Sequence, residues 1–85
     1  MTEADVAERV ERFVREQFAI DPGDSRFGRS VDLFEGAYVD SVGLAEMLGF
    51  IEEEFSVSVP DEELLSDDFG TIDGIAAAVC RLRPA

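Results

Sequence analysis

The chain has 85 residues, a formal net charge of −13, no histidine and no lysine. This length predicts one domain, residues 1–85, with a thin core. Without histidine or lysine the chain lacks the commonest general base, the commonest metal ligand and the usual Schiff-base nucleophile, and its one cysteine, Cys80, excludes a disulfide framework within the chain. We therefore expect neither an enzyme nor a metal site.

The acidic residues gather in one part of the chain. Residues 1–29 and 81–85 together hold seven acids and seven arginines, whereas residues 30–80 hold thirteen acids and no basic residue. An acidic surface repels nucleic acid and anionic membranes and attracts basic patches on partner proteins. We expect such protein partners, although the acids are also consistent with a solvated face that only aids solubility.

The chain is predicted to stay out of membranes. No apolar run approaches the roughly 20 residues that a membrane-spanning helix needs. The N-terminal segment, Met1-Thr2-Glu3-Ala4-Asp5, is acidic and polar, unlike a signal peptide. We expect a cytoplasmic monomer that neither binds nucleic acid nor inserts into a membrane.

Residues 3–18 are predicted to form an amphipathic helix. Thr2 is the expected N-cap, with Asp5 in the first turn, where a negative charge suits the helix dipole. Arginines and glutamates alternate on the solvated face. The apolar residues recur at helical spacing: Val6, Val10, Phe13, Val14 and Phe18.

A long connection follows the first helix. Asp21-Pro22-Gly23-Asp24 predicts the break, and the chain then continues without a helical pattern to about Asp40. A loop of this length is unusual in a small domain, so its apolar residues are expected to pin it over the core. We expect Leu33 and Phe34 to be buried.

Residues 41–55 are predicted to form the second helix. Its core-facing stripe falls at spacings of three and four: Leu44, Met47, Leu48, Ile51 and Phe55. Gly49 lies in the middle of this helix, where it costs about 1 kcal/mol relative to alanine. It either leaves a shallow spot on the outer face or allows another backbone to approach.

The rest of the chain predicts two further helices. Residues 56–60 are expected to be an extended connector, and residues 60–65 a short helix with acids in its first turn. Thr71 is the expected N-cap of the last helix, which Pro84 should end. Its apolar stripe is Ile72, Ile75, Ala76, Val79 and Leu82. The sequence thus predicts an all-α bundle of three main helices and one short helix.

Ser41 is the most informative residue of the chain. It begins the second predicted helix, where a hydroxyl is held at the surface beside the positive end of the helix dipole. Asp40 and Ser41 are also ordinary N-cap residues, and that alternative needs no further function. The apolar neighbours Tyr38-Val39 and Val42, together with the acids that follow, favour an attachment site.

Three sequence blocks at these spacings resemble the acyl carrier and peptidyl carrier proteins, and the resemblance extends from about Val6 to Leu82. The blocks are Leu33-Phe34-Glu35-Gly36, Asp40-Ser41-Val42-Gly43, and Ile51-Glu52-Glu53-Glu54-Phe55 followed by Val59-Pro60. The resemblance implies that a separate transferase attaches 4′-phosphopantetheine from coenzyme A to Ser41. It implies that Asp40 assists this transferase and its metal ion.

The resemblance also implies a surface that partner enzymes contact, namely the second helix. Its implied contact residues are Val42, Ala45, Glu46, Gly49, Glu52 and Glu53. The implied partners are a phosphopantetheinyl transferase, an acyl-loading enzyme, and downstream synthases, ligases or tailoring enzymes with basic docking patches.

Departures from the family pattern bear on the pathway. Val42 replaces the usual leucine, and Gly43, Ala45 and Gly49 make the contact surface small and flat. The arrangement looks closer to free-standing carriers of the D-alanyl type, and to carriers of extender units of the methoxymalonyl type, than to many fatty-acid carriers. We expect a bacterial carrier of polyketide or nonribosomal-peptide metabolism; the alternative is a D-alanyl or fatty-acid carrier of primary metabolism.

Two alternatives from other classes remain open. A small acidic interaction module or inhibitor would need the acids but neither Ser41 nor a prosthetic group. A calcium site within residues 61–73 would need a regular alternation of ligands that this acidic segment lacks.

Overall fold

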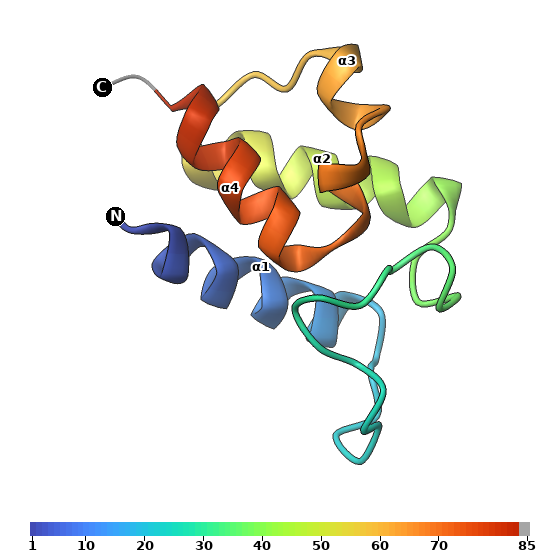
Figure 1. The fold of residues 1–85 in the computed structure, drawn as a ribbon. Helices are drawn as coiled ribbons and strands as arrows, with labels where there is room; N and C mark the ends of the chain where they lie inside the picture. The colour runs from blue at the N-terminus through green and yellow to red at the C-terminus, as the bar shows by residue number, and fades with distance from the viewer. Residues whose placement is uncertain (84–85) are drawn as a thin grey trace.

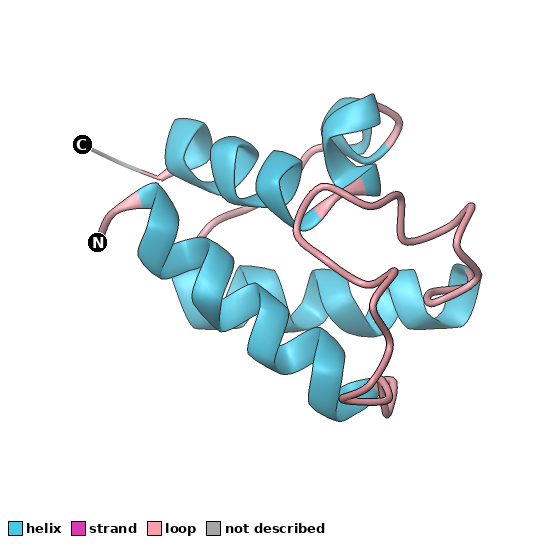
Figure 2. Cartoon of the chain, turned by 60° about the horizontal axis from the view of Figure 1, so that its bottom comes forward, coloured by secondary structure: helices cyan, strands magenta, loops and turns pink. Residues whose placement is uncertain are grey.

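The computed structural model describes residues 1–83, which are helical or loop with no strand (Figures 1 and 2). The elements are α1 (Glu3–Gln17), α2 (Ser41–Phe55), α3 (Asp61–Leu64), a 3-10 turn η1 (Asp67–Gly70) and α4 (Ile72–Leu82). The predicted all-α bundle of three main helices and one short helix is confirmed. Pro84 lies outside the described residues.

Helix α1 begins at the N-cap that the sequence predicts, Thr2, and the cap is a reciprocal capping box with Asp5. Thr2 Oγ1 accepts a hydrogen bond from the Asp5 amide at 3.2 Å, and Asp5 Oδ2 accepts one from the Thr2 amide at 3.0 Å. The bond from the Thr2 backbone holds the pKa of Asp5 below its usual value. Two of the amides that a helix start leaves without partners are thus satisfied.

Helix α1 ends one residue earlier than predicted, and Phe18 is its C-cap. The next residue, Ala19, has φ 49°, and the Ile20 amide bonds back to the Arg15 carbonyl at 3.1 Å. This is a Schellman-type ending, in which glycine is the usual residue at the left-handed position. An L-residue there costs about 1–2 kcal/mol.

Ala19→Gly is therefore expected to raise the free energy of unfolding by about 1 kcal/mol, because glycine takes a positive φ without steric cost. Urea unfolding followed by circular dichroism measures this change. The matched control is Ala45→Gly, at an exposed position within α2, which should lower the same free energy by about 1 kcal/mol. Equal changes in both variants would contradict the argument.

The core lies where α4 packs on α1, with α2 closing one side (Figure 1). Apolar stripes from the three helices meet there, and no buried polar side-chain atom in the described chain lacks a hydrogen-bond partner. Fully buried side chains of this core include Val6, Val10, Val14, Met47, Ile51, Ile72, Ile75 and Val79. Leu44 and Leu48 of the predicted α2 stripe are half-buried against it.

The long loop between α1 and α2 is held on the core by its backbone as well as its side chains. The Leu33 amide donates to the Gly70 carbonyl at 2.8 Å, and the Asp73 amide donates to the Arg29 carbonyl at 2.9 Å. The Tyr38 hydroxyl donates to Asp24 Oδ2 at 2.7 Å and lowers the pKa of that carboxyl. The loop is therefore tied to η1, to α4 and to itself.

One expectation for this loop is wrong. Leu33 is fully buried, as predicted, but Phe34 is 37% exposed. Asp32 Oδ1 accepts hydrogen bonds from the amides of Phe34 and Glu35, both at 2.9 Å. This turn directs Leu33 inward and leaves Phe34 on the surface beside Leu64.

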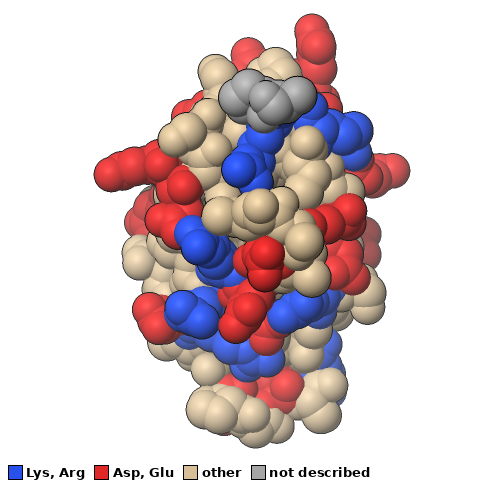
Figure 3. All heavy atoms as spheres, turned by 90° about the vertical axis from the view of Figure 1, so that its left-hand side faces the viewer, with Lys and Arg blue, Asp and Glu red and all other residues tan. Residues whose placement is uncertain are grey.

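A carboxylate on α1 links the arginines of two segments. Glu11 binds Arg29 of the loop at 2.7 Å and Arg15 of its own helix at 2.9 Å. These two hydrogen bonds, the one from Arg29 above all, lower the pKa of Glu11. On the side of the molecule where α1 begins and α4 ends, arginine and acidic side chains are interspersed (Figure 3). Here the two signs of charge neutralise each other.

Candidate functional site

The candidate site is the first turn of α2, and Asp40 caps it. Asp40 Oδ1 accepts a hydrogen bond from the Gly43 amide at 2.8 Å, and its carbonyl accepts one from Leu44 at 2.8 Å. Ser41 is the first residue of the helix rather than its cap. The N-cap role that the sequence left open for both residues thus belongs to Asp40.

Ser41 is exposed, and its hydroxyl has no hydrogen-bond partner among residues 1–83. Because a helix leaves its first amides without partners inside the helix, those of Ser41 and Val42 lie at the positive end of the α2 dipole. A phosphate ester on Ser41 would sit beside these donors. The geometry fits the phosphopantetheine group that the sequence implies.

The apolar surroundings of Ser41 differ in part from the expectation. Val42 is 67% exposed, as an apolar neighbour of an exposed site should be. Val39 is buried, because its amide and that of Tyr38 both bond to the Leu33 carbonyl, at 3.1 and 2.9 Å. Of the three predicted neighbours, Val42 alone is fully open to a partner.

The expected contact residues lie along one face of α2. Positions 42, 45, 46, 49 and 53 follow helical spacing and are all exposed. An added Cβ on Gly49 would meet nothing within 4 Å, so this glycine leaves open space on the surface rather than allowing a backbone to approach.

Two of the three glutamates among the expected contact residues have partners within the protein. Glu52 is half-buried and accepts a hydrogen bond from the Val59 amide at 2.9 Å, which holds the extended connector after α2. Glu46 accepts a bond from Gln17 Nε2 at 2.6 Å. Glu53 has no hydrogen bond or ion pair among the described residues and presents its full charge to solvent.

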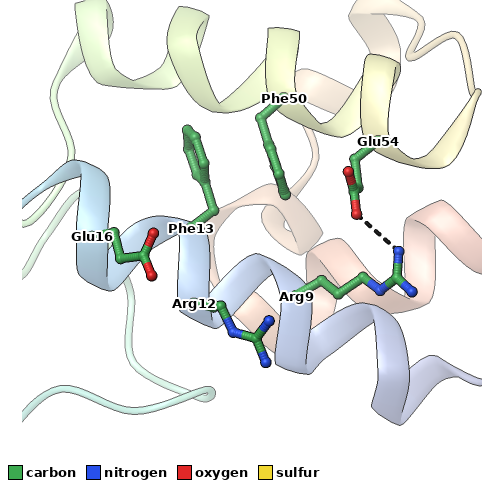
Figure 4. Close-up of a pocket in the computed structure, with 6 residues that line it drawn as sticks. All are labelled: Arg9, Arg12, Phe13, Glu16, Phe50 and Glu54. Atoms are coloured by element: carbon green, nitrogen blue, oxygen red, sulfur yellow. Dashed lines mark hydrogen bonds and ion pairs between the residues drawn. The ribbon is translucent and has the colours of Figure 1, made fainter.

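A groove of about 330 Å³ lies between α1 and α2, away from the exposed face of α2 that carries the expected contact residues (Figure 4). Phe13 and Phe50 stack in it with ring centres 4.2 Å apart, and Arg9 pairs with Glu54 at 2.8 Å. Phe50 is nine residues after Ser41, which is about 13 Å along a helix axis. The groove is therefore separate from the serine.

The structure also reveals contacts that sequence reasoning missed. The ring of Phe18 covers Gly43, so a residue expected only in the α1 core stripe reaches the turn that holds Ser41. Leu65, expected in the short helix, caps it and is 87% exposed. The sequence places Gly43 two residues after Ser41, but nothing in it indicated that Phe18 reaches this turn.

No group of three or more acidic or sulfur ligands that could hold a metal ion occurs within residues 1–83. In the acidic segment 61–73, Glu63 and Asp68 both pair with Arg81, at 3.2 and 3.1 Å. No helix of the described chain has the length and apolar character needed to cross a membrane.

The chain matches known carriers over most of its length. A family model described as "Phosphopantetheine attachment site" matches residues 8–79. The D-alanyl carrier protein of Streptococcus mutans is 31% identical over 81 residues, which cover 95% of this chain and 99% of that protein. Those of Streptococcus sanguinis and Streptococcus gordonii are 32% and 33% identical over the same shares. This chain belongs to the family of carrier proteins that bear 4′-phosphopantetheine.

Proposed function

We propose that Ser41 carries the 4′-phosphopantetheine group and that residues 1–85 act as one carrier domain. The observation that carries this proposal is an exposed serine hydroxyl at the first residue of a helix whose cap is supplied by its neighbour, Asp40. The bound group supplies a thiol that holds an acyl group as a thioester. The protein supplies the attachment point and a surface for partners.

In attachment, which a transferase catalyses, the Ser41 oxygen forms a bond to the phosphorus atom that bears the pantetheine arm of coenzyme A and gives up its proton. The pyrophosphate bond of coenzyme A breaks, and adenosine 3′,5′-bisphosphate leaves. Asp40 Oδ1 is engaged with the Gly43 amide, while Oδ2 has no partner within residues 1–83. We assign Oδ2 the role of approaching the metal ion of the transferase. Asp40 then has two functions, since it caps α2 and helps the transferase to engage.

Partner enzymes are proposed to dock on the exposed face of α2. Long-range attraction between its acids and a basic patch accelerates encounter without requiring tight binding, so the carrier can leave again. A flexible arm then gives each bound enzyme a high local concentration of the acyl group. Val42, Ala45, Glu46, Gly49 and Glu53 are the proposed contacts, and Glu52 contributes mainly by holding the connector.

Glu53→Lys is expected to raise the KM for a phosphopantetheinyl transferase roughly threefold to tenfold at low salt, with little change in kcat. The effect should shrink as salt rises, because exposed charges are screened beyond about 10 Å at 0.1 M. The matched control is Glu3→Lys, which makes the same charge change on α1. Equal effects from both variants would show that net charge matters and the α2 face does not.

The cargo is proposed to be a D-alanyl group, because the relatives that match nearly the whole chain are D-alanyl carriers. They favour the alternative of primary metabolism over the polyketide or nonribosomal-peptide pathway that the sequence analysis preferred. The test is to incubate the protein bearing phosphopantetheine with ATP and a ligase that activates D-alanine, and then to measure its intact mass. Acylation by a malonyl-type transferase, and not by this ligase, would favour a carrier of the polyketide or nonribosomal-peptide pathway instead.

The first experiment tests attachment itself. The protein is incubated with coenzyme A, Mg²⁺ and a broad-specificity phosphopantetheinyl transferase, and its intact mass is measured. A gain of one phosphopantetheine unit is expected. No gain from a protein that circular dichroism shows to be folded would reject the role of Ser41 and favour an acidic interaction module without a prosthetic group.

A further inference from the structure

The α-carbon of Gly43, two residues after Ser41, is covered by the ring of Phe18. A Cβ on Gly43 would lie 2.7 Å from Cε1 and 3.1 Å from Cζ of that ring, and 3.2 Å from Cγ1 of Val39. Carbon atoms in contact are normally about 3.5–4.0 Å apart. Any larger side chain at this position must therefore displace either the ring or the first turn of α2.

Neighbouring aromatic rings restrain Phe18. Phe18 meets Phe13 edge-on, with ring centres 6.2 Å apart. Phe13 stacks on Phe50 (Figure 4), and Phe50 meets Phe55 edge-on, with ring centres 6.1 Å apart. These four rings join the end of α1 to the last two turns of α2. Because Phe13 restrains the Phe18 ring on one side and Val39 Cγ1 would also lie 3.2 Å from the new Cβ, a side chain added at Gly43 would displace the first turn of α2 as well as the ring.

That turn holds Ser41. The Gly43 amide donates to Asp40 Oδ1 at 2.8 Å, so a movement of Gly43 passes to the cap and to the serine between them. We propose that the Phe18–Gly43 contact positions the Ser41 hydroxyl relative to the docking face of α2. This proposal rests on the proposed function of Ser41. Phe18 and Gly43 are positioning residues, because they act through the turn and do not touch the attached group.

The first test measures the rate at which a phosphopantetheinyl transferase attaches the group to Gly43→Ala. Most of the exposed face of α2 that partners contact, from Ala45 to Glu53, lies outside the displaced turn, so KM should stay within about twofold of wild type. The hydroxyl is displaced, and since a misplacement of 1 Å can cost about 10²-fold in rate, kcat should fall about tenfold or more. The matched control is Gly28→Ala in the loop, where a Cβ would meet nothing within 4 Å, and both constants should be unchanged.

The second test is rescue by Phe18→Leu. Phe18→Leu alone removes the contact and should itself lower kcat, though less than Gly43→Ala does. Leucine lacks the Cε1 and Cζ atoms that the new Cβ would meet, so the double variant Phe18→Leu/Gly43→Ala should have the kcat of Phe18→Leu. A Phe18→Leu protein with the wild-type kcat would overturn the proposal, as would a double variant as slow as Gly43→Ala or a change in KM without a change in kcat. If Gly43→Ala alone fails to fold, the kcat of the double variant is compared with that of Phe18→Leu instead.

A readout that does not depend on loading separates this inference from the proposed function. In amide NMR spectra of the unloaded protein, the change that Gly43→Ala causes in the signals of Ser41 and Val42 should be larger when Phe18 is present than in a Phe18→Leu background, because the direct effect of the added methyl group is common to both. Equal changes in the two backgrounds would overturn the positioning role. A wild-type protein that gains no mass would instead refute the function of Ser41, while the NMR comparison would still report on the contact.

Discussion

Ser41→Ala is expected to abolish phosphopantetheine attachment while changing the free energy of unfolding by less than about 0.5 kcal/mol. Asp40 supplies the N-cap, and the Ser41 hydroxyl has no partner within the described chain, so the fold loses no hydrogen bond. Alanine is also the best helix former. Intact mass measures attachment, and urea unfolding measures stability.

The matched control is Ser58→Ala. Ser58 is an exposed serine of the connector after α2, and its replacement should leave loading at the wild-type level. If Ser41→Ala still gained the mass of the group, attachment would occur at another residue. If the variant unfolded, Ser41 would be chiefly structural.

Gly74→Ala is expected to lower the free energy of unfolding by about 3 kcal/mol or more, which is severe for so small a domain. A Cβ on Gly74 would overlap the carbonyl group of Asp68 and lie 2.7 Å from its Cα. These are backbone atoms, which cannot rotate away as a side chain can. Helix α4 would have to move off η1, which would expose part of the core around Ile72 and Ile75.

Gly49→Ala is the matched comparison for stability. It makes the same change at a helical position where the new Cβ would meet nothing, and it should raise the free energy of unfolding by about 1 kcal/mol. Urea unfolding of both variants should therefore give changes of opposite sign. A Gly74→Ala protein as stable as wild type would show that α4 and η1 are not closely packed.

The helices could be predicted from the sequence because their signals are local. The Thr2 cap, the apolar spacing of α2 and the Thr71 cap depend on residues within one or two turns. The loop was harder to predict. Phe34 is exposed although it is as apolar as Leu33, because the Asp32 turn decides which of the two faces the core. Hydrophobicity alone does not carry that information.

The candidate site was predictable only in part. Its position at the start of α2 followed from the motif around Ser41, but the division of roles between Asp40 and Ser41 required the cap geometry. The contact between Phe18 and Gly43 joins residues 25 positions apart and depends on how α1 and α2 cross. The ion pairs of Arg81 with Glu63 and Asp68 likewise depend on where the short elements dock.

The placement of the start of α1 and the end of α4 has a practical consequence for experiments. The start of α1 and the end of α4 lie at one side of a molecule whose longest dimension is 38 Å, and α2 begins at the opposite side (Figures 1 and 2). A purification tag, a fluorescent fusion or a solid support joined at either end would leave the serine facing outward. Immobilised protein should therefore remain a substrate, which allows loading to be followed on a surface.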